Sequence, residues 1–295
     1  MAILAVAAAL LFVGAAAAQA ADVATNADPA APLHARYADL KGELADNQFK
    51  RPLHMSSYEG SVGVTGEIFA LIDSPFAVAS EGLDKASQWC EILILHLNIK
   101  YCRPGLDSQG AVLQVSIGKK YDQTMEQAYR VVFAFRMAAR TENYLQVKLS
   151  ADEGPLGTSD YHIVLEAAPE EGQTFIRMSY SYSYGMVGWL AMQAYLGTVG
   201  RGKVGFTVVG NEPDGRPRYI GGMRGVVERN TMRYYLAVDA FIGALSGPPA
   251  ARLEKSLNDW FAGIERFPRQ LHEMEREAYL DMKHREYARQ QAGVS

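Results

Sequence analysis

The stretch from Tyr219 to Leu245 constrains the fold most strongly, because its pattern changes from that of a strand to that of a helix. Residues 219–228 form an extended, glycine-bearing run with Ile220, Val226 and Val227, which predicts a strand. The next apolar residues recur at i, i+4, i+7 and i+11, as one stripe along a helix requires: Tyr234, Val238, Phe241 and Leu245. A long helix fed directly by the last strand predicts an antiparallel sheet curved around that helix.

The preceding chain supplies strands for such a sheet. Extended segments, most of them with alternating apolar and polar residues, occur at 58–72, 92–101, 111–117, 129–137, 145–149, 161–165, 177–184 and 203–209. Alternation gives each strand one apolar face, which suits an antiparallel sheet folded over a core. We therefore expect an α+β fold in which a curved antiparallel sheet grips a long C-terminal helix, with an extra helical arm beyond it.

A strand-to-helix junction in the first half of the chain carries a family resemblance. It reads Ile72, Asp73, Ser74, Pro75 and Phe76, and a helical stretch with Trp89 follows. Ser74 offers an N-cap side chain, with proline in the first helical turn. This pattern resembles the opening of START-like or polyketide-cyclase-type helix-grip domains of the SRPBCC superfamily. The resemblance implies a sheet folded around the long helix, with an apolar ligand between them.

The N-terminal residues point to export. Residues 1–20 are apolar and end in Ala18-Gln19-Ala20, a small-x-small pattern, although the usual Lys or Arg at the start is missing. We expect a signal peptide cleaved near Ala20 and a periplasmic or secreted protein; an uncleaved membrane anchor is the alternative. In an exported chain, the pair Cys90 and Cys102 favours a disulfide, whereas two buried free thiols remain compatible with the spacing.

We expect four parts along the chain. They are a signal peptide (1–20), a tether with a short helix (21–54), a helix-grip domain (55–245) and a C-terminal helical arm (246–295). The arm keeps a helical apolar period from Leu253 to Ala278, and Pro268 should kink it. Its charged second half is expected either to be solvated or to meet a partner helix, which makes 253–290 a candidate protein-binding segment.

Three tyrosines in the strand 177–184 predict an amphipathic wall. Tyr180, Tyr182 and Tyr184 share one face, and a tyrosine ring with its polar tip suits a cavity for a largely apolar ligand. The alternative is an aromatic ladder with outward hydroxyls. The complete candidate lining is Phe133, Phe135, Tyr180, Tyr182, Tyr184, Trp189, Tyr234, Arg224 and Glu228. The last two would share a strand face, either as a structural pair or with a charged group toward the ligand.

The segment 186–199 contains no charged residue and has helical residues, with Trp189 and Met192 on different sides. It is too short to span a bilayer. Core burial is the default interpretation; a lid over the cavity and contact with a membrane surface are the alternatives.

Other functional classes find little support in the sequence. The net charge of -4 and pI near 5.9 give no basic excess, so nucleic acid is not an expected partner. Gly197 to Lys203 resembles a phosphate-binding loop but has Val204 in place of the hydroxyl residue. His272 and Glu273 begin a zinc motif whose second histidine is replaced by Arg276. We therefore expect neither a cofactor nor a metal.

Three functions remain. The first is an exported binding or carrier protein for a lipid-like or other apolar small molecule held between sheet and helix. The second is a cyclase or hydratase on the same fold, with Tyr182, His96 or Glu228 as acid or base. The third is an envelope protein-interaction module that uses the C-terminal arm.

Overall fold

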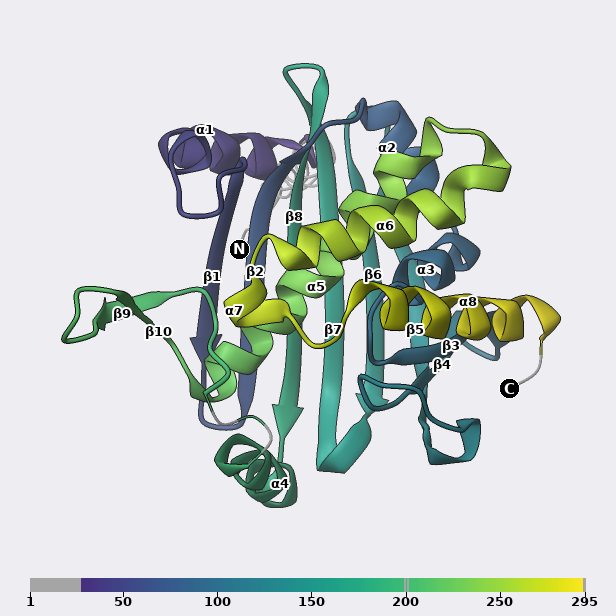
Figure 1. Ribbon diagram of the computed structural model, residues 1–295. Helices are drawn as coiled ribbons and strands as arrows, with labels where there is room; N and C mark the ends of the chain where they lie inside the picture. Colours follow the sequence, from purple (N-terminus) through teal and green to yellow (C-terminus); the bar gives the residue numbers. More distant parts are fainter. Residues whose placement is uncertain (1–27, 199, 201, 294–295) are drawn as a thin grey trace, which may run out of the picture.

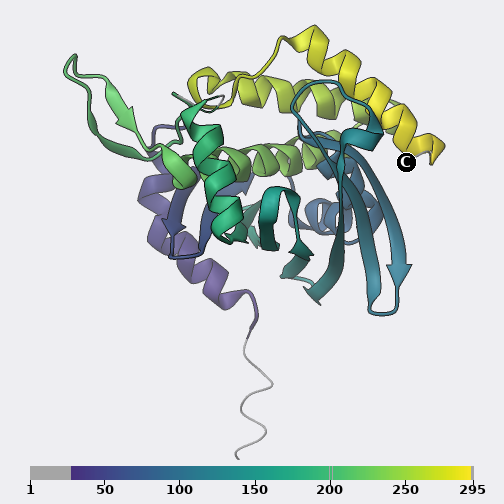
Figure 2. The same cartoon turned by 90° about the horizontal axis from the view of Figure 1, so that it is seen from below.

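The computed structural model describes residues 28–293 except 199 and 201, and in this part of the chain it confirms the expected α+β helix-grip architecture. A large antiparallel sheet lies behind one long helix, α5 (Gly222–Leu245), which runs across its face (Figure 1). The view from below shows the sheet curling around α5, with α6 and α8 outside it (Figure 2).

The described strands form one eight-stranded sheet and a separate hairpin. The sheet order is β1-β2-β8-β7-β6-β5-β4-β3, and every neighbouring pair is antiparallel. Its strands are β1 (Leu53–Glu59), β2 (Gly63–Ile72), β3 (Ile99–Asp107), β4 (Gly110–Ile117), β5 (Tyr129–Arg140), β6 (Leu145–Glu153), β7 (Thr158–Glu170) and β8 (Gln173–Tyr184). The hairpin consists of β9 (Val208–Asn211) and β10 (Pro217–Tyr219).

The other helices surround the sheet and α5. They are α1 (Ala31–Ala45), α2 (Phe76–Leu83), α3 (Ala86–Leu93), α4 (Met186–Gly197), α6 (Arg252–Glu265), α7 (Pro268–Leu271) and α8 (Arg276–Ala292). Single 3-10 turns are η1 (Met125–Gln127), η2 (Pro155–Gly157) and η3 (Pro249–Ala251). Helix α1 packs on the face opposite α5, where Leu40 and Tyr37 lie against Phe175 and Phe69.

The space between the sheet and α5 is largely filled by side chains. Met178 on β8 lies opposite Ile68 on β2 and Leu165 on β7, and all three are buried in the main core. Helices α2 and α3 fill one end of the grip. There the indole of Trp89 is buried and donates a hydrogen bond to the Leu83 carbonyl at 2.9 Å. The disulfide expected between Cys90 on α3 and Cys102 on β3 is present and ties this end to the sheet edge.

The strand predicted at 219–228 is wrong. The chain enters α5 at Gly222, and β10 ends at Tyr219 in a hairpin outside the large sheet. Gly221, Gly222 and Gly225 interrupt the apolar pattern, so the helical period could not be recognised in the sequence. In the structure, Met223 and Val227 lie four residues apart on the buried side of the helix. Gly225 allows a close approach, because a Cβ atom there would lie 3.0 Å from the Ile220 carbonyl oxygen.

Other boundaries also differ from the predictions. The predicted strand 92–101 begins as the end of α3, and β3 starts only at Ile99; a continuous buried apolar run suits a buried helix as well as a strand. Instead of one long strand at 58–72 there are two, β1 and β2. Helix α2 begins after Pro75 without a side-chain cap from Ser74. The predicted strand 203–209 is reduced to the first residues of β9.

The C-terminal arm folds back onto its own domain. Pro268 starts a new short helix, α7, so the predicted kink is a complete break between α6 and α8. In α8 the side chains of Tyr279, Met282, Lys283 and Glu286 are buried, so one face of this half packs on the domain instead of being solvated, and binding of a partner helix stays a prediction. The sequence misled here because two of the four buried positions carry charges.

Candidate ligand-binding site

A cavity of about 250 Å³ lies between the sheet and one end of α5. Strands β7 and β8 form one wall, α5 forms the opposite wall, and α4 with η2 closes the end. Its described lining is Asn98, Lys120, Pro155, Leu156, Thr158, Tyr161, Tyr180, Tyr182, Gly188, Met192, Val226, Arg229, Asn230 and Arg233. The cavity is therefore bounded by aromatic rings on the sheet side and by polar and charged groups on the helix side.

The aromatic wall consists of Tyr180 and Tyr182 from β8 and Tyr161 from β7. The ring centroids of Tyr161 and Tyr182 are 5.4 Å apart in a stacked arrangement, and Tyr180 is 5.7 Å from Tyr182. Alternation along β8 places these rings on the face toward α5. The Tyr161 hydroxyl is 2.8 Å from Thr158 Oγ1. The Tyr182 hydroxyl is buried and has no hydrogen-bond partner among the residues that the structure describes.

The opposite wall is one face of α5. Val226, Arg229, Asn230 and Arg233 follow each other at i, i+3, i+4 and i+7, so all four point toward the cavity from one side of the helix. Arg229 and Arg233 are only 2% and 1% exposed. Guanidinium groups buried this deeply need anionic or strongly polar partners. Arg229 Nη1 donates to the Val204 carbonyl at 3.2 Å.

Behind this wall lies Glu273, in the connection between α7 and α8, which pairs with several cationic side chains. It forms ion pairs with Arg233 at 2.8 Å, with Lys120 from the β4–β5 loop and with Lys203. Burial opposes the ionisation of Glu273, but Arg233 and Lys120 outweigh this effect and lower the pKa of Glu273 to about 2. Burial and the charge of Arg233 lower the pKa of Lys120 to about 7, although Glu273 acts in the opposite direction.

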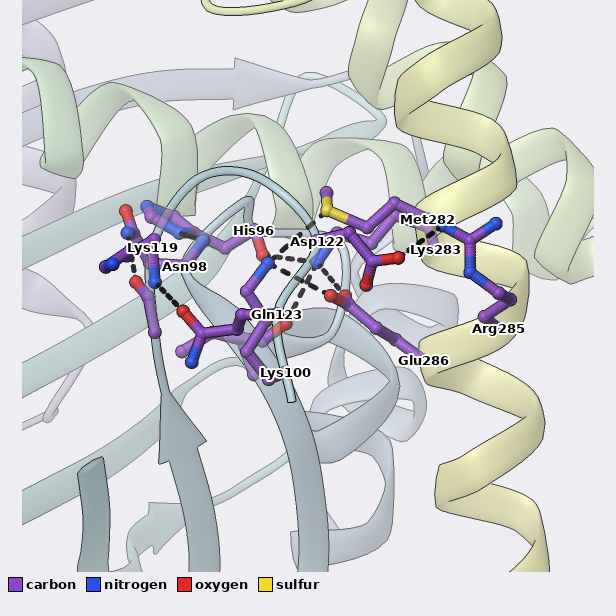
Figure 3. A network of polar contacts seen from close by, with 12 residues as sticks. His96, Asn98, Lys100, Lys119, Asp122, Gln123, Met282, Lys283, Arg285 and Glu286 are labelled. Atoms are coloured by element: carbon purple, nitrogen blue, oxygen red, sulfur yellow. Dashed lines mark hydrogen bonds and ion pairs between the residues drawn. The ribbon is translucent and has the colours of Figure 1, made fainter. Parts of the chain in front are cut away.

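The loop that carries Lys120 is fixed by backbone and side-chain hydrogen bonds (Figure 3). Asn98 Nδ2 donates to the Gly118 carbonyl at 2.6 Å, and the Gly118 amide donates to the Asn98 carbonyl at 2.7 Å. Gln123 Oε1 accepts from the Lys119 amide at 2.7 Å. Asn98 and Lys120, which both line the cavity, therefore have defined positions.

Helix α8 anchors the chain just before β3 through buried charges (Figure 3). Lys283 Nζ donates to the carbonyls of His96 and Ile99 at 2.7 and 2.9 Å. Glu286 pairs with Lys283 at 2.7 Å and with Lys100 at 3.0 Å. Burial lowers the pKa of Lys283 to about 8, while Glu286 acts against this shift. The arm therefore supports the segment from which Asn98 reaches the cavity.

Two of the predicted lining residues belong to the described lining of the cavity, and the others lie outside it. Tyr180 and Tyr182 line the cavity. Next to it lie Tyr184, whose hydroxyl donates to Glu59 at 3.3 Å, and Phe133, whose ring meets that of Tyr161 edge to face at 6.3 Å. Phe135 is half-buried at the edge of the core.

Tyr234 lies one layer behind the cavity, between two other rings. Its centroid is 5.2 Å from Tyr180 and 4.6 Å from the imidazole of His96. Burial and then Arg233 lower the pKa of His96 well below its usual value, so the ring is neutral. His96 Nδ1 accepts a hydrogen bond from the Asn98 amide, which assigns the ring proton to Nε2. Among the acid–base candidates Tyr182, His96 and Glu228, only Tyr182 lines the described cavity.

Arg224 and Glu228 lie on α5 and organise neighbouring segments. Glu228 is buried and accepts hydrogen bonds from the amides of Phe206 and Thr207 at 2.5 and 2.9 Å, and from the hydroxyls of Thr207 and Ser57 at 2.6 and 2.5 Å. Arg224 Nε donates to the same Ser57 hydroxyl at 2.9 Å. These contacts tie α5 to β1 and to the segment before β9.

Helix α4 closes the cavity but exposes several of its described side chains, so core burial, the default interpretation of 186–199, is wrong for the described part of this segment; residue 199 lies outside the described residues. Met186, Leu190 and Trp189 are 80%, 55% and 46% exposed. On the inner side, Gly188 packs against η2 so closely that a Cβ atom would lie 2.9 Å from the Gly157 oxygen, and Met192 lines the cavity. Figure 2 shows α4 across the open end of the grip.

Sequence reasoning missed seven polar or aromatic residues of the described lining: Asn98, Lys120, Thr158, Tyr161, Arg229, Asn230 and Arg233. The alternation of β7 could have identified Tyr161, and a helix begun at Gly222 would have placed both arginines on the cavity face. Lys120 lies in a loop and has no periodic signal.

In the described part of the chain, none of the helices combines the length and apolar character needed to cross a membrane. Within the same residues, no group of three His, Cys, Asp or Glu side chains is placed to hold a metal ion.

Comparisons with known proteins give weak similarities. No protein-family model and no curated protein matches the chain. Among solved structures it is similar to Ara h 8.0201, with 12% identity over 66% of this chain and 99% of the other, and a TM-score of 0.36. A point mutant of norcoclaurine synthase from Thalictrum flavum is 13% identical over 48% of this chain and 91% of the other, with a TM-score of 0.33. The di-domain ARO/CYC protein BexL is 14% identical over 78% of this chain and 57% of the other, with a TM-score of 0.32.

Similarities at this level carry no argument about what the chain does. The sheet order and the course of α5 across the sheet are features of the chain itself. They agree with the resemblance seen at the strand-to-helix junction after Ile72. At the level of the fold, this chain has a helix-grip architecture, in which an antiparallel sheet curves around one long helix.

Proposed function

We propose that this protein is an exported binding protein for a compact small molecule with an apolar body, held between the tyrosine wall and α5. The observation that carries the proposal is the cavity itself, with three stacked or tilted tyrosine rings on one side. Ligand sites are typically concave and largely apolar, with a few polar groups that fix orientation. Tyr161, Tyr180 and Tyr182 supply the apolar surface here.

The cavity volume restricts the ligand. At about 250 Å³ it lies below the roughly 300–1,000 Å³ range of sites for drug-sized molecules. Trp89 and its neighbours on α2 and α3 occupy the other end of the grip. A complete long-chain lipid is therefore too large for this cavity. A compact molecule, or one end of a longer one, fits better.

A carrier must also admit and release its ligand, and α4 is the helix that covers one end of the cavity. It packs on η2 and the end of β8 through Gly188, while its outer face is exposed. We expect α4 to move outward as a lid. Contact of its exposed face with a membrane surface, and protein binding through 253–290, stay predictions.

Export is part of the proposal. The disulfide Cys90–Cys102 supports it, because disulfides persist in oxidising compartments outside the cytosol. Fractionation of cells that express the full chain, with N-terminal sequencing of the mature protein, tests this part separately. A mature protein that begins near residue 21 outside the cytosol is the expected result.

Native mass spectrometry of protein purified from its native envelope tests the binding role. We expect an added mass that disappears on denaturation. Val226→Phe, which places a ring in the cavity from α5, should abolish it, whereas Val208→Phe on the exposed β9 is the matched control and should retain it. If wild-type protein carries no added mass and binds neither phenylpropanol nor phenylpropanoate, the binding role is refuted.

A further inference from the structure

We propose that the cavity recognises an anionic group, so that the ligand is a small amphiphilic acid whose carboxylate or similar anion lies against Lys120, Arg229 and Arg233. This inference rests on the proposed binding function and adds the chemical class of the ligand. It follows from the charges, the hydrogen-bond donors and the asymmetry of the cavity.

Positive side chains predominate among the charged residues of the described lining. Lys120, Arg229 and Arg233 line the cavity, and none of its described lining residues is Asp or Glu. The carboxylate behind the wall, Glu273, pairs with three cations, Lys120, Lys203 and Arg233. The nearly complete burial of Arg233 limits screening of these charges by water. The cationic lining would therefore attract an anion in the cavity.

The cavity also offers hydrogen-bond donors suited to an anion. Lys120 Nζ has three N–H groups, and its described acceptor is Glu273. The Tyr182 hydroxyl is a donor in the cavity wall, nine-tenths or more buried, without a partner among the described residues. A buried polar group without a partner needs an explanation, and a role in binding a ligand supplies one. Hydrogen bonds from such donors to an anion are stronger than those to a neutral acceptor.

The two sides of the cavity differ, which favours an amphiphile over a simple anion. The cations come from α5 and the β4–β5 loop, whereas the rings of Tyr161, Tyr180 and Tyr182 come from the sheet. A ligand with its anion toward α5 and its apolar body toward β7 and β8 uses both. Inorganic phosphate would leave the aromatic wall without a contact.

Isothermal titration calorimetry on the full chain at pH 6 tests the inference with three probes. Phenylpropanoate and phenylpropanol share one carbon skeleton and differ in charge, and inorganic phosphate lacks the apolar body. We expect phenylpropanoate to bind at least about tenfold more tightly than phenylpropanol, and phosphate to bind far more weakly than either.

Two neighbouring lysines provide a matched pair of variants. Lys120→Gln should reduce the preference for the acid to about threefold or less and leave the affinity for phenylpropanol unchanged. Lys119→Gln, on the exposed adjacent residue, should keep the full preference. The alcohol also reports whether Lys120→Gln still folds. If Lys120→Gln does not fold, Tyr182→Phe is the replacement variant, and it should weaken the binding of phenylpropanoate more than that of phenylpropanol.

The outcomes separate the two proposals. Equal affinities for acid and alcohol would overturn the anion inference and leave the binding function intact. Absence of binding by both would overturn both proposals. Phosphate binding as tightly as phenylpropanoate would mean that the apolar body contributes nothing, and would overturn the amphiphilic acid.

Discussion

Two tyrosines that stack side by side in the cavity wall should respond in opposite ways to loss of their hydroxyl groups. The rings of Tyr161 and Tyr182 stack at 5.4 Å, and phenylalanine retains this packing in either position. The Tyr161 hydroxyl is bonded to Thr158, whereas that of Tyr182 is buried without a described partner. The substitutions Tyr161→Phe and Tyr182→Phe therefore isolate the hydrogen bonds.

The expected magnitudes follow from these contacts. Thr158 Oγ1 also donates to the Pro155 carbonyl, so the Tyr161 hydroxyl is the donor to Thr158. Losing this bond should lower the free energy of unfolding by about 1 kcal/mol. Burial of an unpartnered hydroxyl costs about 1–3 kcal/mol, so Tyr182→Phe should leave the stability of the ligand-free protein unchanged or raise it by about 1 kcal/mol.

Urea denaturation at neutral pH, followed by tryptophan fluorescence, measures both values. Both variants should unfold with the same dependence on urea, because neither changes the surface exposed on unfolding. A Tyr182→Phe variant destabilised as much as Tyr161→Phe would refute the reasoning, since it would show that the Tyr182 hydroxyl is bonded within the folded protein. If Tyr182→Phe is more stable than the wild type but binds phenylpropanoate more weakly, the result would support a role of the Tyr182 hydroxyl in ligand binding.

Three further predictions concern charged groups. The folded pKa of Glu273, about 2, lies below the ordinary value of 4.5 for this group. Its contribution of about 3 kcal/mol should therefore be present above pH 4.5 and be lost as the pH falls toward 2; Glu273→Gln should flatten this part of an acid-unfolding curve. Glu286→Gln leaves two buried lysines without their carboxylate and should cost about 3 kcal/mol in urea unfolding, whereas the exposed Glu277→Gln on the same helix should cost less than about 0.5 kcal/mol. The pKa of Lys120 is about 7, and its charged neighbours are Glu273, Arg233 and Lys203. Because Lys120 loses its charge as the pH rises from 6 to 8, the affinity for phenylpropanoate should fall over this range. An affinity that does not change with pH would contradict a protonated Lys120 at the anion.

Strand alternation made much of the sheet predictable. In β8 it placed three tyrosines on the inner face, and two of them line the cavity. It failed where the local pattern suits two structures, as in the apolar run that starts at Ile92 near the end of α3. It also failed where glycines interrupt a helical period, as at Gly221, the N-cap of α5, and at Gly222 and Gly225 in its first turn.

The polar half of the site depends on tertiary contacts that leave little trace in the sequence. Lys120 reaches the cavity because Asn98 and Gln123 hold its loop. Glu286 is buried although it lies in a charged segment, because α8 packs on β3. The exposed position of α4 was not predictable either, since an uncharged helix is compatible with a core, a lid and a surface.

The most direct test of the central claim is the position of a bound acid. Intermolecular nuclear Overhauser effects between phenylpropanoate and protein with labelled tyrosine rings measure it. The ring protons of the ligand should show effects to Tyr180 and Tyr182, and Val226→Phe should remove them. Effects confined to tyrosines outside the cavity, such as the exposed Tyr58 and Tyr121, would contradict a ligand site between the sheet and α5.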